Sequence, residues 1–157
     1  MATRLTEGQP APDITTQTDT GETVSLQDFA GKRVVLYFYP KDDTPGCTIE
    51  ACSFRDNMGD VQNEDAVILG ISLDDVGSHQ QFRDKYELTF PLLADTDHKV
   101  AEAYGVYGKK EFRGHEYMGI DRATFIIGTD GTLEKVWPQV NPQGHAEEVI
   151  AWLRDHK

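Results

Sequence analysis

The chain contains one almost continuous apolar run, Arg33-Val34-Val35-Leu36-Tyr37-Phe38-Tyr39, which is rich in β-branched and aromatic residues. Such a run is typical of a strand that is covered on both faces, as strands are in parallel sheets. Pro40 ends the predicted strand, because proline has no N–H to donate to a neighbouring strand. A polar loop over residues 41–46 then leads into a helical stretch predicted from about Cys47 to Val61. This strand–loop–helix unit indicates an α/β protein.

The segments on either side of this unit continue the alternation of strands and helices. Asp19-Thr20-Gly21 is a turn signal, and it predicts a small N-terminal β-hairpin from Asp13–Thr18 and Glu22–Ser25. Ser25 is expected to cap a short helical turn over residues 26–29. In chain order, the other predicted elements are a strand over 66–72, a helix over 76–86, a short edge strand over 91–93, a helical turn over 98–104, a surface loop over 114–119, strands over 123–127 and 133–137 joined at Asp130-Gly131, and a helix over 146–154.

This order predicts one fold class, a central mixed β-sheet with helices on both faces. A chain of 157 residues has the length of a single domain, and we expect one domain over residues 1–157. The N-terminal residues lack an apolar core, and no apolar run approaches the roughly 18 residues of a spanning helix. The composition therefore predicts a cytoplasmic protein with no membrane partner.

The charge of the chain also restricts its partners. Aspartate and glutamate number 27 against 15 lysines and arginines, which gives a formal net charge of −12. Such a surface repels phosphate backbones and anionic lipids, so we expect neither nucleic acid nor a membrane surface to bind.

Only two cysteines are present, and both lie in the six residues from Cys47 to Cys52. Two thiols are too few for a disulfide-rich scaffold or a four-thiolate zinc site. The five histidines are distant in sequence from both cysteines and show no short ligand spacing. We therefore expect neither a metal nor a cofactor.

Cys47 is predicted to lie in the first turn of a helix that follows a buried strand. The N–H groups of a first helical turn lack intrahelical partners, and together with the helix dipole they favour an anion. For a cysteine that anion is the thiolate, which is the reactive nucleophile. Pro45 suits a helix start, Gly46 allows close approach of a small ligand, and Thr44 supplies a hydroxyl. A lone helical cysteine is more often a small buried apolar residue, but this Pro/Gly-rich loop favours a working thiol.

The spacing of the two cysteines decides how they can react with each other. Five residues along an ideal helix give a rise of about 7.5 Å and a rotation of about 140°, which separates the Cα atoms by about 8.7 Å. A disulfide requires Cα atoms within about 4.4–6.8 Å. The helix therefore predicts a resting dithiol, and a Cys47–Cys52 bond requires that the first helical turns unwind.

The sequence from Phe38 to Cys52, FYPKDDTPGCTIEAC, contains the pattern Pro-x-x-x-Thr-x-x-Cys at Pro40, Thr44 and Cys47. This stretch resembles the peroxiredoxins, and within them the bacterioferritin comigratory protein (peroxiredoxin Q) subfamily. That subfamily often carries a resolving cysteine five residues after the peroxidatic one, which matches Cys52. A second match starts at Arg122, in Arg122-Ala123-Thr124-Phe125-Ile126-Ile127. Gly128 departs from the aspartate usual in the family, and Ala123 from its common serine or threonine.

The resemblance implies a thioredoxin-like fold and a thiol peroxidase that serves antioxidant defence. Its substrates are expected to be hydrogen peroxide and organic hydroperoxides, which oxidise Cys47 to a sulfenic acid. Condensation with Cys52 then gives an intrachain disulfide, which a thioredoxin-type dithiol reduces. Members of the subfamily are often monomeric, and we expect a monomer.

The resemblance also assigns roles to individual residues. Arg122 is expected to supply a cation beside the thiolate and the peroxide. Thr44 is expected to hydrogen-bond the thiolate and orient the peroxide, and Pro40 to shield the thiol from water. The backbone N–H groups of Gly46 and Cys47 would hold the second peroxide oxygen. Glu50 either helps to hold the arginine or is an ordinary solvated carboxylate.

Two other functions remain open on the same fold. One is a redox sensor or thiol-dependent chaperone, which would use the cysteines without rapid turnover of peroxide. The other is a non-catalytic interaction domain, in which Cys47 would be an ordinary thiol that reacts slowly with peroxide.

Overall fold

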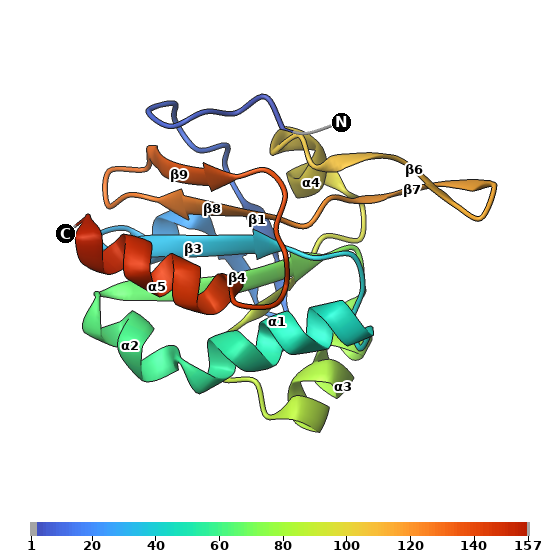
Figure 1. The fold of residues 1–157 in the computed structure, drawn as a ribbon, viewed down its shortest axis with the longest axis horizontal. Helices are drawn as coiled ribbons and strands as arrows, with labels where there is room; N and C mark the ends of the chain where they lie inside the picture. Colours follow the sequence, from blue (N-terminus) through green and yellow to red (C-terminus); the bar gives the residue numbers. More distant parts are fainter. Residues whose placement is uncertain (1–2, 157) are drawn as a thin grey trace.

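The structure is a computed structural model that describes residues 3–156, and its main feature is a seven-stranded mixed sheet (Figure 1). The strands lie in the spatial order β2-β1-β5-β4-β3-β8-β9. The three central strands β5, β4 and β3 run parallel, and the pairs toward both edges are antiparallel. Their bounds are β1 Thr15–Thr18, β2 Thr23–Ser25, β3 Arg33–Phe38, β4 Ala66–Ser72, β5 Leu92–Ala94, β8 Ala123–Ile127 and β9 Leu133–Trp137.

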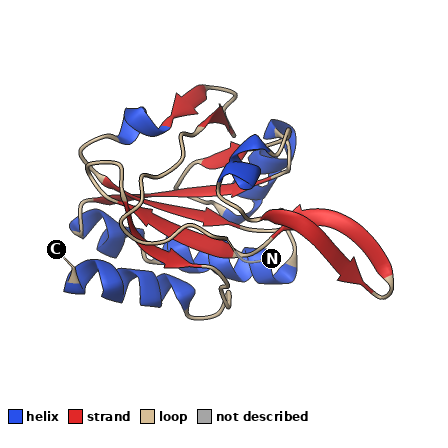
Figure 2. Ribbon diagram, turned by 90° about the horizontal axis from the view of Figure 1, so that it is seen from above, coloured by secondary structure: helices blue, strands red, loops and turns tan. Residues whose placement is uncertain are grey.

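Helices cover both faces of this sheet, as the view along its edge shows (Figure 2). One face packs against α1 (Pro45–Asp56), α2 (Met58–Asn63), α3 (Val76–Tyr86) and α5 (His145–Asp155). The other face packs against the 3-10 helix η1 (Leu26–Phe29) and α4 (Lys99–Ala103). The predicted mixed sheet with flanking helices and an N-terminal hairpin is confirmed, because β1 and β2 pair antiparallel around residues 19–22.

The apolar run of the sequence forms β3 at the centre of the sheet, and all six of its residues are buried. Val35 and Tyr37 face the core under α1 and α5, whereas Val34 and Leu36 face the core under α4. A strand with helices on both faces has no solvent side, and this explains why the run shows no alternation of polar residues.

The predicted helix from Cys47 to Val61 is wrong in its bounds, because it is two helices. The first begins two residues earlier, at Pro45, and the chain leaves the helical conformation at Asn57, where φ is −110° and ψ is 14°. The side-chain amide of Asn57 donates to the carbonyl of Ser53 at 2.7 Å. Asparagine side chains compete in this way with the backbone bonds of a helix, which accounts for the break.

The short strand predicted at residues 91–93 as an edge strand is instead internal. It forms as β5 (Leu92–Ala94) and pairs with β4 on one side and with β1 on the other. The N-terminal hairpin therefore extends the sheet beyond β5, and a strand of three residues shows no sign of this in its sequence.

The surface loop predicted over residues 114–119 is also wrong for residues 115–119, because they belong to strand β7 (His115–Ile120). It pairs antiparallel with β6 (Tyr107–Phe112) in a two-stranded hairpin that projects from the body of the protein (Figures 1 and 2). Tyr117 and Met118 are exposed neighbours on β7. With most of β7 exposed, it carries no buried, alternating apolar side that would identify it as a strand.

The carboxyl end of β3 is the place where the predicted site residues meet. Phe38 pairs with Ala123 of the antiparallel strand β8, so Arg122, which immediately precedes β8, lies beside the loop that leaves β3. The parallel strand β4 ends at Ser72 and leads into α3 at the same edge. No helix among residues 3–156 is long and apolar enough to cross a membrane.

Candidate active site

Cys47 occupies the third position of α1, and its side chain is almost completely enclosed. Thr44 is the N-cap and Pro45 the first helical residue. Gly46 and Cys47 follow, and at these positions a helix provides no carbonyl partner for the backbone N–H. The first helical bond joins the N–H of Thr48 to the carbonyl of Thr44 at 2.8 Å. The thiol therefore lies at the positive end of a helix, where an anion is favoured.

The Arg122 guanidinium reaches Cys47 from the other side of the site. One terminal nitrogen, Nη2, donates to the Cys47 Sγ at 3.2 Å, and the other, Nη1, donates to Glu50 Oε1 at 2.8 Å. These two bonds fix both the position and the plane of the guanidinium. The arrangement places a permanent cation against the sulfur inside a mostly buried site.

Glu50 is buried, with 1% of its surface exposed, so the interpretation of this residue as a solvated carboxylate is wrong. Burial raises its pKa from 4.5 to about 7, although the charge and the hydrogen bond of Arg122 act in the opposite direction. Among residues 3–156, its second oxygen, Oε2, finds no hydrogen-bond partner. The carboxyl group is therefore held by Arg122, one helical turn after Cys47.

Three residues that precede Cys47 in the sequence, Pro40, Thr44 and Gly46, differ in their contacts. A Cβ on Gly46 would meet Arg122 Nη2 at 3.1 Å, so glycine leaves the space in which the guanidinium reaches the sulfur. The Thr44 hydroxyl donates to the carbonyl of Lys41 at 2.9 Å, so this proton is already used and the Thr44 oxygen remains as an acceptor. Pro40 is exposed at the start of the loop.

A buried polar network under the loop was missed by the sequence analysis. The Asp42 carboxylate accepts from Tyr39 Oη at 2.6 Å and from Ser78 Oγ at 2.8 Å, and its Oδ2 lies 2.7 Å from His79 Nδ1. His79 is completely buried and lies in α3. Asp42 and His79 are 37 positions apart in the sequence, which is beyond the span of any local motif, so no signal in the sequence pairs them.

Cys52 lies on the same helix and is partly exposed, and both cysteines are free thiols. The helix α1 runs unbroken from Pro45 to Asp56. Five positions along such a helix separate the Cα atoms of Cys47 and Cys52 by about 8.7 Å, which is beyond the distance that a disulfide allows. Ala51 and Phe54 anchor the middle of this helix in the core. The structure is thus the dithiol form, in which Cys47 is enclosed and Cys52 is held apart from it.

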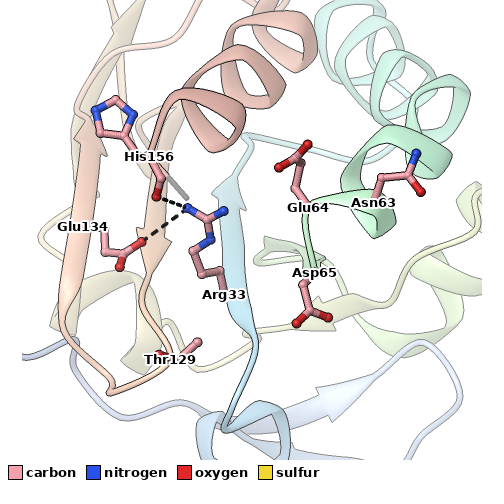
Figure 3. Close-up of a pocket in the computed structure, with 7 residues that line it drawn as sticks. All are labelled: Arg33, Asn63, Glu64, Asp65, Thr129, Glu134 and His156. Atoms are coloured by element: carbon pink, nitrogen blue, oxygen red, sulfur yellow. Dashed lines mark hydrogen bonds and ion pairs between the residues drawn. The ribbon is translucent and has the colours of Figure 1, made fainter.

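A pocket of about 420 Å³ lies at the opposite end of β3 and is unrelated to the cysteines (Figure 3). Arg33 lines it and donates to the backbone carbonyls of Leu153 and His156 at 3.2 and 3.0 Å. These carbonyls belong to the end of α5, where a cation satisfies the unpaired acceptors and the negative end of the helix. The arginine in this pocket thus caps a helix.

The pH dependence of stability is expected to change when Glu50 is replaced by glutamine. The folded-state pKa of about 7 exceeds the ordinary glutamate value of 4.5, so between these values the folded protein retains a proton that the unfolded chain has lost. Stability should therefore fall as the pH rises through this range, by on the order of 3 kcal/mol from this group. Glutamine keeps an acceptor for Arg122 but does not ionise, so urea unfolding of Glu50→Gln should show a flatter profile between about pH 5 and pH 8.

The matched control is Glu116→Gln, which removes an exposed carboxylate that pairs with Lys109 on the β6–β7 hairpin. Its unfolding profile should remain parallel to that of the wild-type protein. Equal pH dependence in Glu50→Gln and the wild-type protein would contradict the assignment of a raised pKa to Glu50.

Known proteins match almost the full length of this chain. The model of the AhpC/TSA family matches residues 7–136. The putative peroxiredoxin Bcp of Coxiella burnetii is 52% identical over 146 residues, which cover 93% of this chain and 97% of that protein. Peroxiredoxin Bcp of Bacillus subtilis is 50% identical over 148 residues, which cover 94% of both chains.

Solved structures agree with these sequence matches. Peroxidoxin BcpB of Mycobacterium tuberculosis superposes with a TM-score of 0.88 at 33% identity and covers 98% of this chain and 99% of its own. The bacterioferritin comigratory protein of Xanthomonas campestris superposes with a TM-score of 0.86 at 36% identity, with 91% of each chain covered. The predicted thioredoxin-like fold is thereby confirmed. The chain belongs to the AhpC/TSA family and, within it, to the peroxiredoxins of the Bcp, or peroxiredoxin Q, type.

Proposed function

We propose that this protein is a thiol peroxidase in which Cys47 is the nucleophile. The observation that carries the proposal is the contact of Arg122 Nη2 with the Cys47 Sγ at 3.2 Å, at the N-terminus of α1. A thiol in this position faces a helix dipole and a guanidinium, and both stabilise negative charge on sulfur. Membership of the peroxiredoxins and the described alkyl peroxide reduction of the Xanthomonas campestris relative support the same chemistry.

The first step consumes one peroxide. The Cys47 thiolate attacks one peroxide oxygen, the O–O bond breaks, and the sulfur becomes a sulfenic acid. The second oxygen leaves as water or as an alcohol once it receives a proton. Negative charge develops on this leaving oxygen, and the Arg122 guanidinium and the N–H groups of Gly46 and Cys47 would stabilise it. The Thr44 oxygen would accept a hydrogen bond from the peroxide proton, because the hydroxyl donates its own proton to the carbonyl of Lys41.

The second step uses Cys52. Its thiol attacks the sulfenic sulfur, a disulfide forms, and water leaves. Because the two Cα atoms are too far apart on an intact helix, α1 must unwind between residues 45 and 52. A dithiol reductant of the thioredoxin type then restores both thiols by exchange and becomes a disulfide itself.

Mass spectrometry after one equivalent of hydrogen peroxide tests both steps. We expect the wild-type protein to lose two hydrogens and to yield a linked peptide that contains Cys47 and Cys52, together with a loss of helical signal. The Cys52→Ser variant should instead gain one oxygen on Cys47, because no partner thiol is available. A disulfide-linked dimer on a non-reducing gel would contradict the intrachain mechanism.

Steady-state turnover separates an enzyme from a redox sensor. Peroxide consumption should be rapid and continuous with thioredoxin, thioredoxin reductase and NADPH, both for hydrogen peroxide and for an organic hydroperoxide. Oxidation once per chain without turnover by this or another dithiol reductant would favour the sensor.

Four further expectations extend this proposal. The reductant is a thioredoxin-type dithiol, since the product of resolution is an intrachain disulfide. The protein acts in the cytoplasm, where a reducing pool maintains free thiols such as Cys47 and Cys52. It acts as a monomer, as members of the subfamily that it resembles often do. Residues 1–157 form one domain, of which the structure describes residues 3–156, and a single sheet takes its strands from Thr15 to Trp137.

A further inference from the structure

His79 contacts two hydrogen-bond acceptors inside the protein. Its Nδ1 lies 2.7 Å from Asp42 Oδ2, and its Nε2 lies 2.8 Å from the backbone carbonyl of Leu93. An ionised carboxylate and a carbonyl both accept hydrogen bonds and donate none. A neutral imidazole carries only one N–H and satisfies one of these contacts, whereas the imidazolium satisfies both. With Asp42 ionised, the geometry therefore favours a positively charged ring.

The groups that face this ring favour its charge. Asp42 comes from the loop after β3, Asp74 from the turn after β4, Tyr39 from the end of β3, and Leu93 offers its carbonyl from β5. Burial works against the charged ring, but the hydrogen bond and charge of Asp42, with smaller contributions from Leu93 and Asp74, outweigh it and raise the pKa of His79 above 6.5.

The carboxylate of Asp42 is correspondingly well satisfied. The carboxylate accepts from Tyr39, Ser78 and His79. In addition, the backbone N–H of Asp42 donates to Asp74 Oδ2 at 2.8 Å. A buried carboxylate with three donors, one of them cationic, is held in one position, because loss of the cation leaves an uncompensated buried charge and loss of a hydroxyl leaves an unpaired acceptor. The position of Asp42 fixes the middle of the loop between Pro40 and Thr44.

This loop requires such support. Asp43, the next residue, has a φ of 58°, which non-glycine residues adopt infrequently. Thr44 then begins α1 as its N-cap, so the course of the loop decides where the helix starts and where Cys47 lies within it. Small displacements of a reacting group by residues that do not touch it have large effects on rate.

We propose that His79 is a positioning residue for the Cys47 site. As a buried imidazolium, His79 holds Asp42 and thereby fixes the loop that precedes α1.

A second contact between α3 and this loop serves as a comparison for the His79–Asp42 pair. Lys85 of α3 pairs with Asp43 of the same loop at 2.8 Å, but both side chains are largely exposed. An exposed pair of this kind contributes little, so the buried contact should be the one that determines the loop conformation.

The protonation state of His79 is the first test and does not depend on peroxidase activity. Nitrogen NMR of the wild-type protein, with the signal assigned through His79→Gln, should show both ring nitrogens protonated at neutral pH. As the pH rises through the folded-state pKa, the ring should lose one proton and the amides of residues 42–48 should exchange faster. A neutral ring with a single tautomer at neutral pH would overturn the proposal.

The second test compares variants by hydrogen exchange and by reaction with peroxide. His79→Gln should accelerate exchange of the loop amides and lower the second-order rate of Cys47 oxidation about tenfold, with the folded fraction unchanged. Lys85→Gln should leave both values within about twofold of wild type, as expected for an exposed pair. Equal effects of the two variants would overturn the proposal, because they would show that any tether from α3 suffices.

A double variant tests the charge itself. Asp42→Asn and His79→Gln each leave one charged group without its partner, whereas the combination removes both charges. The combined change in loop exchange should be smaller than the product of the two single changes, and multiplicative effects would overturn the proposal. The peroxide rate alone rests on the proposed function. If the wild-type protein does not react with peroxide, the proposed function fails, while NMR and hydrogen exchange still decide the role of His79.

Discussion

Replacement of Cys47 by serine is expected to reduce peroxide consumption to the uncatalysed background. Serine occupies a similar volume in this enclosed position, but its hydroxyl does not ionise near neutral pH. The helix N-terminus and Arg122 remain in place, so the variant loses the nucleophile and keeps its surroundings. Consumption of hydrogen peroxide with an excess of a dithiol reductant measures the effect.

Cys52→Ser is the matched control for this variant, because it changes the other thiol of the same helix. It should still consume one equivalent of peroxide per chain at an almost unchanged rate. Full activity of Cys47→Ser would show that the proposed nucleophile is wrong, and first-turnover activity in Cys47→Ser together with inactivity of Cys52→Ser would assign the attack to Cys52.

Replacement of Arg122 should have the second largest effect. Arg122→Met removes the cation and both donors while it keeps an unbranched side chain, and we expect the rate constant for oxidation of Cys47 to fall by about 10²–10³-fold. Arg122→Lys keeps a positive charge. A single ammonium group does not reproduce the planar fork that reaches Cys47 Sγ at 3.2 Å and Glu50 Oε1 at 2.8 Å together, so this variant should also be impaired, although less severely.

Rapid-mixing kinetics with hydrogen peroxide measure these rate constants, and urea unfolding shows whether each variant is folded. Arg154→Met is a suitable control, because Arg154 forms an exposed pair with Asp60 away from the cysteines. It should react like the wild-type protein. A rate for Arg122→Met within a few-fold of wild type would remove the arginine from the proposed mechanism.

The local elements of the fold could be predicted from the sequence because their signals are local. The apolar run of β3 has a continuous pattern, and Asp19-Thr20-Gly21 and Asp130-Gly131 mark hairpin turns through residues that adopt turn conformations easily. The strand β7 was missed because most of it lies in solvent and shows no apolar alternation. The internal position of β5 was missed because strand order depends on which segments pair, and three residues do not specify a partner.

The chemistry of the candidate site was likewise predictable where it depends on neighbouring residues. The position of Cys47 after Thr44-Pro45-Gly46 indicates a helix start, and the spacing to Cys52 follows from helix geometry. The burial of Glu50 was not predictable in this way, because a carboxylate one turn into a helix faces either solvent or core, depending on what packs against it.

By itself, the sequence determined the central strand, the helix start at the thiol and the spacing that keeps the two cysteines apart, because each depends on residues within a few positions of one another. The tertiary structure alone decided that Arg122 meets Cys47 across 75 residues of chain and that His79 meets Asp42 across 37. These contacts arise from the pairing of β8 and β4 with β3, which brings three chain segments to one edge of the sheet. Pairing between distant strands is decided by burial of the whole core, and no short stretch of residues records it.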